Sequence, residues 1–190
     1  MIFRLRVVSV LAALLAVGLL AAPNPGLAVE VAIGEKATEK DAFLFSRLFH
    51  DATEFSVKMG PLPHYRAYKT DAATGAKTLL GFLFKTHEVE PDEWAYAGPI
   101  ETLVGLTTAG TITEIRILYH REPFGSFSID PPEFRTQFEG KSILAPFEIG
   151  EDVDAVSRAT FTVDGAARAI KKGSRKIMQQ YLAEQKKAKK

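Results

Sequence analysis

Cysteine is absent from all 190 residues of the sequence. This absence excludes disulfide bonds, thiolate ligands for zinc or iron–sulfur clusters, and covalent haem attached through Cys-x-x-Cys-His. It also excludes a lipoprotein anchor, which requires a cysteine at the mature N-terminus. Any redox chemistry in this protein must therefore depend on an organic cofactor.

The sequence also has few histidines, and its positive and negative charges nearly balance. The four histidines, His50, His64, His87 and His120, have none of the short spacings that zinc ligands use. Lys and Arg together number 24 against 23 Asp and Glu, so the formal net charge is only +1. We therefore expect no metal site and no nucleic-acid partner, and the length fits one globular domain.

Long apolar runs are confined to the N-terminus. Arg4 and Arg6 precede the uncharged apolar run 7–22, and a stretch with two prolines then leads to the small residue Ala28. This order predicts a signal peptide over residues 1–28 and therefore an exported, periplasmic protein. An uncleaved membrane anchor is the alternative, although the run is shorter than the roughly 20 residues of a membrane span.

The remaining sequence predicts an α+β domain, with a small, mostly antiparallel sheet flanked by an N-terminal and a C-terminal helix. Apolar spacing predicts the first helix from Thr38 to Val57 and the second from about Phe161 onward. Alternating and β-branched stretches predict strands over 64–70, 79–84, 100–106 and 111–119, with a polar loop over 87–93.

Three segments follow the expected signal peptide. They are an N-terminal extension with its helix (29–62), the α+β domain (63–183) and a tail (184–190) that is rich in lysine. The tail is either a solvated helix end or a segment that docks to anionic lipid or an acidic partner.

The segment before the C-terminal helix combines acids with hydroxyls. Asp152 and Asp154 precede Ser157 and Thr160 where this helix is expected to begin. One interpretation is helix capping by Ser157 or Thr160, with the acids at the positive end of the helix dipole. The other is attachment of a phosphate to a hydroxyl, because the N–H groups of a helix start bind phosphoryl oxygens. Arg158 could then neutralise one phosphate charge.

The run Asp154-Ala155-Val156-Ser157-Arg158-Ala159-Thr160 resembles the flavinylation motif of the FMN-binding domain family. The similarity extends to Tyr96-Ala97-Gly98-Pro99-Ile100, to His120-Arg121-Glu122-Pro123-Phe124-Gly125 and to Phe138-Glu139-Gly140-Lys141. It spans roughly Tyr65 to Ala169, and the stretch Tyr65 to Thr86 is most similar to the family's nitrous oxide respiration regulators. Because the similarity extends over most of the domain, a chance match of one motif does not explain it.

The resemblance implies that a separate flavin transferase joins FMN to Thr160 by a phosphoester bond. Asp154 and Ser157 would belong to the signal that the transferase reads, and Ala159 would leave room for the reactant. The loop containing His120, Glu122 and Gly125 would lie near the flavin ring, with Phe124 or Trp94 as ring neighbours. Arg158 replaces the residue that is usually Gly, and we interpret it as a sign that the backbone there does not need a positive φ.

Two functions are consistent with these residues. In the first, covalent FMN transfers electrons between a membrane-bound iron–sulfur or quinone-linked redox protein and another extracytoplasmic protein. In the second, the protein is a non-redox binding or adaptor module that keeps the fold without covalent flavin, and Arg158 is the feature that favours it. A self-contained flavin enzyme ranks last, because the sequence shows no acid–base constellation.

Overall fold

The computed structural model describes residues 36–189. The expected signal peptide, residues 1–28, lies outside the described residues. Within them, no helix is both long and apolar enough to cross a membrane.

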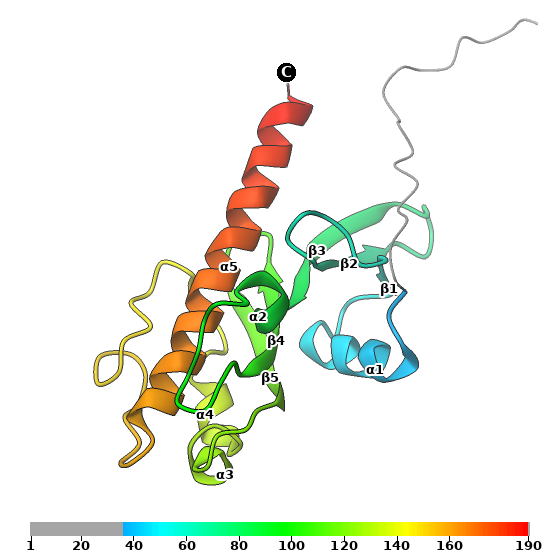
Figure 1. Ribbon diagram of the computed structural model, residues 1–190. Coiled ribbons are helices and arrows are strands. Elements are labelled where there is room, and N and C mark those ends of the chain that lie inside the picture. The colour runs from blue at the N-terminus through cyan, green and yellow to red at the C-terminus, as the bar shows by residue number, and fades with distance from the viewer. Residues whose placement is uncertain (1–35, 190) are drawn as a thin grey trace, which may run out of the picture. The chain divides into compact units, whose positions relative to one another are not determined.

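A five-stranded sheet forms the centre of the domain, and every strand pairs antiparallel with the next one along the chain (Figure 1). The predicted sheet is confirmed. The strands are β1 (Glu54–Phe55), β2 (Tyr65–Thr70), β3 (Lys77–Lys85), β4 (Glu101–Thr107) and β5 (Ile112–Tyr119). This order places the apolar strand β3 in the middle, as its burial on both faces requires.

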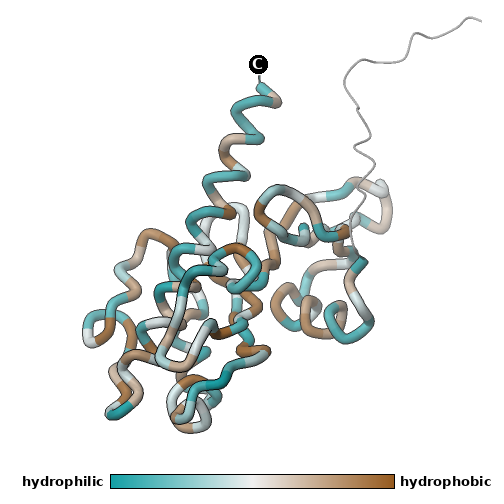
Figure 2. The backbone as a smooth tube through the Cα atoms, in the orientation of Figure 1, coloured by the Kyte–Doolittle hydropathy of each residue, from teal (hydrophilic) through white to brown (hydrophobic). Residues whose placement is uncertain are grey.

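The two faces of the sheet carry two separate apolar cores, and the alternation along β3 divides its side chains between them. Figure 2 shows how hydrophobic and hydrophilic residues alternate along the backbone. Phe82 and Phe84 pack on one face with residues of the C-terminal helix α5 (Thr160–Ala188), among them Ile170. Leu83 packs on the other face in the core that includes Phe45 and Leu48 of helix α1 (Glu39–Leu48). The predicted flanking of the sheet by an N-terminal and a C-terminal helix is confirmed.

Helix α1 begins where the sequence predicts but ends earlier. The Thr38 hydroxyl accepts the backbone N–H of Asp41, and the Asp41 side chain accepts the N–H of Thr38, which is a capping box. The helix ends at Leu48, so the predicted extension to Val57 is wrong. Phe55 instead lies in β1 opposite Ala67, and its ring packs 5.4 Å from that of Phe45.

Three short helices complete the domain: α2 (Thr86–Val89), α3 (Gly125–Ser128) and α4 (Pro132–Thr136). The segment expected as a polar loop over 87–93 therefore contains a helical turn. Its first residue is anchored by tertiary contacts, because the buried Thr86 hydroxyl donates to the Ile100 carbonyl and accepts the Thr102 N–H. A hydrophobic pattern of four residues is too short to reveal such a turn.

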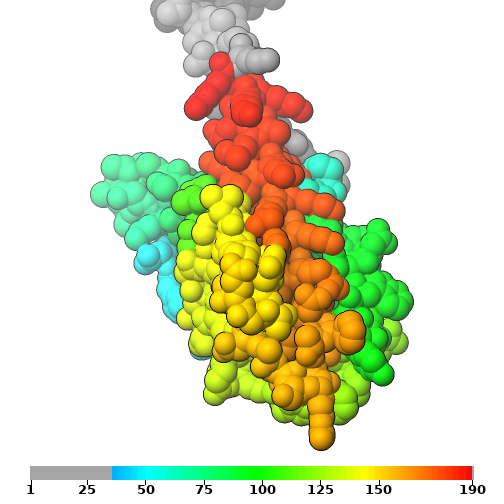
Figure 3. All heavy atoms as spheres, turned by 90° about the vertical axis from the view of Figure 1, so that its left-hand side faces the viewer, coloured from blue at the N-terminus to red at the C-terminus, as the bar shows by residue number. Residues whose placement is uncertain are grey.

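Helix α5 begins at Thr160, close to the predicted position, and continues into the lysine-rich tail as far as Ala188. Gly173 lies in its buried face because the helix approaches β3 closely there: a Cβ atom would lie 2.7 Å from the Phe84 ring. In Figure 3 the segment between α4 and α5 lies along the side of α5. Helix α5 is thus packed against the sheet and against the segment that precedes it.

Candidate functional site

The first turn of α5 has no side-chain cap. Its N-cap residue is Ala159, no side chain among the described residues caps it, and the turn contains no acidic residue. The interpretation that Ser157 or Thr160 caps this helix is therefore wrong. The backbone N–H groups of the first turn and the positive end of the helix dipole are left for a ligand, and an anionic ligand is the kind they favour.

Arg158 adopts a left-handed backbone conformation, with φ at +69°. The expectation that Arg158 marks a backbone without a positive φ is wrong. The tight turn into α5 imposes this conformation, since the Ala159 N–H donates to the Val156 carbonyl at 3.0 Å. A positive φ is costly for a residue with a Cβ atom, so this position stores local strain of about 1 kcal/mol.

A cavity of about 140 Å³ opens beside this turn. Its lining comes from three parts of the chain that are distant in sequence: Tyr96, Phe124, Arg158, Ala159, Phe161 and Thr162. The three aromatic residues are unusually exposed for their size, Tyr96 at 68%, Phe124 at 40% and Phe161 at 74%. Exposed rings around a helix N-terminus suit a ligand that has both a flat ring system and an anionic group.

The structure brings most of the predicted site residues to this end of α5. Arg158, Ala159 and Phe124 line the cavity, Thr160 is exposed between two of its lining residues, and Asp154 and Ser157 are exposed on the preceding loop. Trp94, the other suggested ring neighbour, does not line the cavity. The sequence does not identify Tyr96 and Phe161 as ring neighbours, because it does not reveal which aromatic side chains stay exposed.

The loop that carries Tyr96 is fixed to the side of α5. Gly165 allows close approach, since a Cβ atom there would lie 2.6 Å from the backbone of Ala95. Arg168 donates to the Trp94 carbonyl at 3.0 Å and, together with Lys172, pairs with Glu93. Burial alone would raise the pKa of Glu93, but the hydrogen bonds and charges of Lys172 and Arg168 outweigh it and lower that pKa.

The loop from His120 to Gly125 also contacts the start of α5. His120 Nε2 lies 3.0 Å from an Asp130 carboxylate oxygen, and its ring occupies the space where a Cβ of Gly125 would be. Glu122 reaches the helix itself and accepts the Thr162 hydroxyl proton at 2.6 Å. This loop and the start of α5 are therefore held in one arrangement.

A salt bridge between Lys141 and Asp152 holds the loop that leads to Thr160. Lys141 Nζ donates to an Asp152 carboxylate oxygen at 2.9 Å and lies over the rings of Phe138 and Phe147. Asp152 also accepts the Glu148 N–H at 2.7 Å. Burial alone would raise the pKa of Asp152, but the bond to Lys141 and the backbone N–H donors of Glu148 and Phe147 lower it.

The Lys141–Asp152 salt bridge predicts that the free energy of unfolding falls in acid. Because the pKa of Asp152 is lower in the folded state, its contribution is complete above the ordinary value of 3.8 and is lost as the pH falls below it. We expect the free energy of unfolding, measured by urea titration between pH 6 and pH 3, to fall less steeply in Asp152→Asn than in the wild type. Equal slopes for the two proteins would show that the pair does not stabilise the fold.

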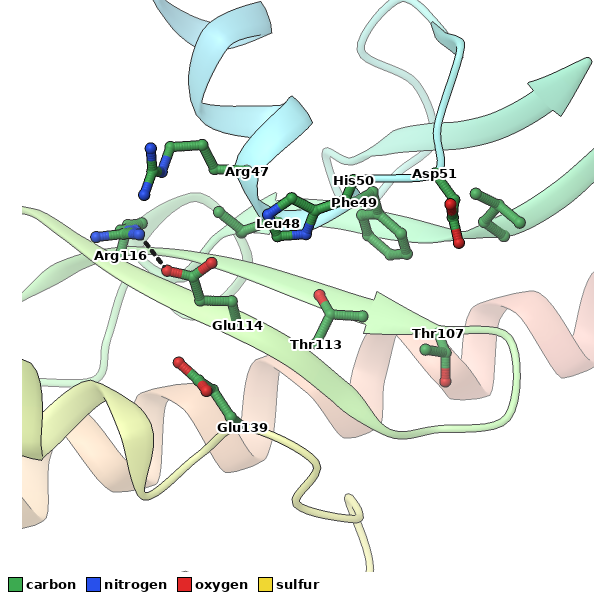
Figure 4. A pocket seen from close by; sticks show the side chains of 11 residues that line it. Arg47, Leu48, Phe49, His50, Asp51, Thr107, Thr113, Glu114, Arg116 and Glu139 are labelled. Carbon is green, nitrogen blue, oxygen red and sulfur yellow. Dashed lines mark ion pairs between the residues drawn. The ribbon is translucent and has the colours of Figure 1, made fainter.

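A larger cleft, of about 630 Å³, lies on the other face of the sheet, between the end of α1 and strand β5 (Figure 4). Its charged groups include Asp51, Glu114 and Glu139, and Glu114 is paired with Arg116. Arg47 and Arg116 also line this cleft, but its three carboxylates outnumber them, and the negative end of the α1 dipole disfavours a phosphate there. Size alone therefore does not identify the anion site, and the smaller cavity at the positive end of α5 fits an anion better.

In the described part of the chain, no group of three or more His, Cys, Asp or Glu residues is placed to hold a metal ion. Comparison with known families shows that residues 95–174 fit the model described as the FMN-binding domain. A comparison with curated proteins finds no match. The matched segment contains every residue that lines the cavity, together with Thr160.

Proposed function

Because residues 95–174 belong to the FMN-binding domain family, the protein is an FMN-binding flavoprotein, and we propose that it carries this FMN covalently on Thr160. The observation that carries the proposal is the position of Thr160. Its side chain is exposed at the first residue of α5, at an uncapped helix start and beside a cavity rimmed by aromatic residues. An ester-linked phosphate on this hydroxyl would meet the unpaired N–H groups of the first turn.

The residues present fit both parts of FMN. Arg158 lines the cavity, so its guanidinium can reach the phosphate, and no salt bridge to another described residue competes for it. Tyr96, Phe124 and Phe161 offer ring faces and edges to the isoalloxazine, which stacks favourably on aromatic side chains. Bound FMN would supply one- and two-electron transfer, while the protein supplies orientation and electrostatics.

Attachment requires a group transfer that this chain does not perform alone. We propose that a flavin transferase uses FAD, whose pyrophosphate bond breaks as the FMN phosphate bonds to the Thr160 oxygen. AMP is the leaving group, and the hydroxyl proton is released. The exposed side chains of Asp154 and Ser157 lie on the approach to Thr160, where the transferase can read them.

We further propose that the protein acts outside the cytoplasmic membrane as an electron carrier. A covalent bond keeps the cofactor where free flavin would be lost by dilution. The electron donor or acceptor in the membrane would be an iron–sulfur or quinone-linked protein, and the second partner another extracytoplasmic protein. The cavity is open to solvent at its aromatic rim, so a ring held there would remain accessible to a partner.

The test of covalent attachment is fluorescence that survives unfolding. The protein is produced with its own N-terminus and a flavin transferase, separated on a denaturing gel and illuminated to excite flavin. A fluorescent band that depends on the transferase supports the proposal. A colourless, non-fluorescent protein made with an active transferase would favour the alternative function, an adaptor of the same fold without covalent flavin.

Arg158 is the residue whose substitution distinguishes the flavoprotein from the adaptor without flavin. Its positive φ predicts how substitutions change the free energy of unfolding. Arg158→Gly should raise the free energy of unfolding by about 1 kcal/mol, because Gly adopts φ +69° without strain. Arg158→Ala loses the same charge but keeps the strain, so it should show no such gain in a urea titration. We expect both variants to accept FMN, since the attachment point and the turn are retained.

Two other results for the Arg158 variants would contradict these expectations. If Arg158→Gly is less stable than Arg158→Ala, the strain is not present and the side chain stabilises the turn. If FMN attaches only to Arg158→Gly, the native Arg158 blocks the transferase and the adaptor function gains support.

A further inference from the structure

Glu122 is a buried carboxylate whose two oxygens both accept hydrogen bonds. Its side chain belongs to a residue only 6% exposed. Oε1 accepts the Ala97 N–H at 2.7 Å, and Oε2 accepts the Thr162 hydroxyl proton at 2.6 Å. Two accepted bonds are the pattern of an ionised carboxylate, which has no donor of its own.

The two bonds join the walls of the cavity. Ala97 follows the cavity residue Tyr96, and Thr162 lines the cavity from α5. Glu122 itself lies two residues before Phe124, the third wall, and its backbone N–H donates to His120 Nδ1 at 3.1 Å. One side chain therefore connects the three segments that supply the aromatic rim.

The Glu122 carboxylate forms its bonds with neutral donors rather than with a cation. No salt bridge joins Glu122 to a Lys, Arg or His within residues 36–189. Its compensation comes from the Ala97 N–H, the Thr162 hydroxyl and the positive end of the α5 dipole. A carboxylate buried behind the Thr162 wall of the cavity therefore places negative charge near any ring held inside.

We propose that Glu122 is a positioning residue that fixes the three walls of the cavity and lowers the reduction potential of the flavin held there. The second half of this inference rests on the proposed function, because it requires FMN in the cavity. The first half concerns only the protein. Negative charge near the ring opposes the addition of electrons, and the low polarity of a buried site strengthens that effect.

Substitutions can separate geometry from charge. In Glu122→Gln the amide oxygen can accept the Ala97 N–H, and the amide N–H₂ can donate to the Thr162 hydroxyl, which accepts as readily as it donates. This variant should keep both bonds and lose only the charge. Glu122→Ala loses both bonds and the charge. Thr162→Val is the matched control, because it removes one bond and keeps the charge.

The geometric half is tested on flavin-free protein by amide hydrogen exchange. We expect the Ala97 amide to exchange at least about tenfold faster in Glu122→Ala than in the wild type, because its acceptor is gone. In Glu122→Gln and Thr162→Val the acceptor of this amide remains, so its exchange should stay near the wild-type rate. Unchanged exchange in Glu122→Ala would overturn the positioning role, whatever the state of the flavin.

The electrostatic half is tested by redox titration of the flavin-loaded proteins. Glu122→Gln should raise the ratio of reduced to oxidised flavin at fixed potential roughly tenfold, a shift of about +30 mV for a two-electron couple. Thr162→Val should produce no positive shift. A potential in Glu122→Gln equal to that of the wild type, or a positive shift in Thr162→Val, would overturn the electrostatic role.

Failure of the proposed function gives a different pattern. If none of the proteins, the wild type included, retains flavin on a denaturing gel, the covalent attachment is wrong and no potential can be compared. The exchange rates of the Ala97 amide still decide whether Glu122 holds the walls of the cavity.

Discussion

Thr160→Ala is expected to abolish covalent FMN attachment while leaving the fold intact. Thr160 is exposed and caps nothing, so removing its hydroxyl breaks no hydrogen bond that stabilises α5. The loss should therefore be all-or-none for fluorescence on a denaturing gel, with a change of only a few tenths of a kcal/mol in the free energy of unfolding. Thr160→Ser retains a hydroxyl at the same place and should accept FMN.

Ser157→Ala provides the matched control for this result. Ser157 is exposed on the loop that leads to Thr160, and its hydroxyl is an alternative acceptor. The variant should keep its flavin, although the transferase is expected to modify it more slowly. A Thr160→Ala protein that stays fluorescent, with the flavin located on Ser157 by peptide fragmentation, would move the attachment point to Ser157.

Phe138→Ala should produce the largest loss of stability, about 3–5 kcal/mol, as is typical when a buried aromatic side chain is truncated. Phe138 is completely buried and lies between two other rings, 5.1 Å from Phe134 and 6.0 Å from Phe147. Its ring also supports Lys141, which holds the loop before Thr160 through Asp152. We expect both a lower urea midpoint and slower flavin attachment.

Phe43→Ala is the control for the loss of an aromatic side chain as such. Phe43 lies on the outer side of α1 and is largely exposed, so its truncation should change the free energy of unfolding by less than about 0.5 kcal/mol. Flavin attachment should be unaffected, since α1 and the start of α5 lie on opposite faces of the sheet. Equal losses in the two variants would contradict the assignment of Phe138 to the core that supports the site.

The sheet was predictable because its residues repeat a simple physical pattern. Strands β4 and β5 are rich in β-branched and apolar residues and lie on either side of a short turn, and such a hairpin needs no distant partner to be identified. The start of α1 was predictable for a similar reason, since the capping box of Thr38 and Asp41 is local. Its end was not, because Phe55 continues the helical spacing but finds its partners in β2 and in the Phe45 ring.

The candidate site was predictable only in part. The sequence identified the start of α5 and the loop from His120 to Gly125, because both match a known motif. It could not give the backbone angle of Arg158, which the turn between Val156 and Ala159 imposes. Nor could it show that Tyr96 and Phe161 stay exposed beside the same cavity, since their exposure depends on how the loop around Ala95 packs against Gly165.

Intact mass spectrometry of the exported protein, made with a flavin transferase, tests the central proposal most directly. We predict a mass increase equal to FMN minus one water, located by peptide fragmentation on Thr160. A protein without this increase in the presence of an active transferase, or an increase located on another residue, would contradict the proposal.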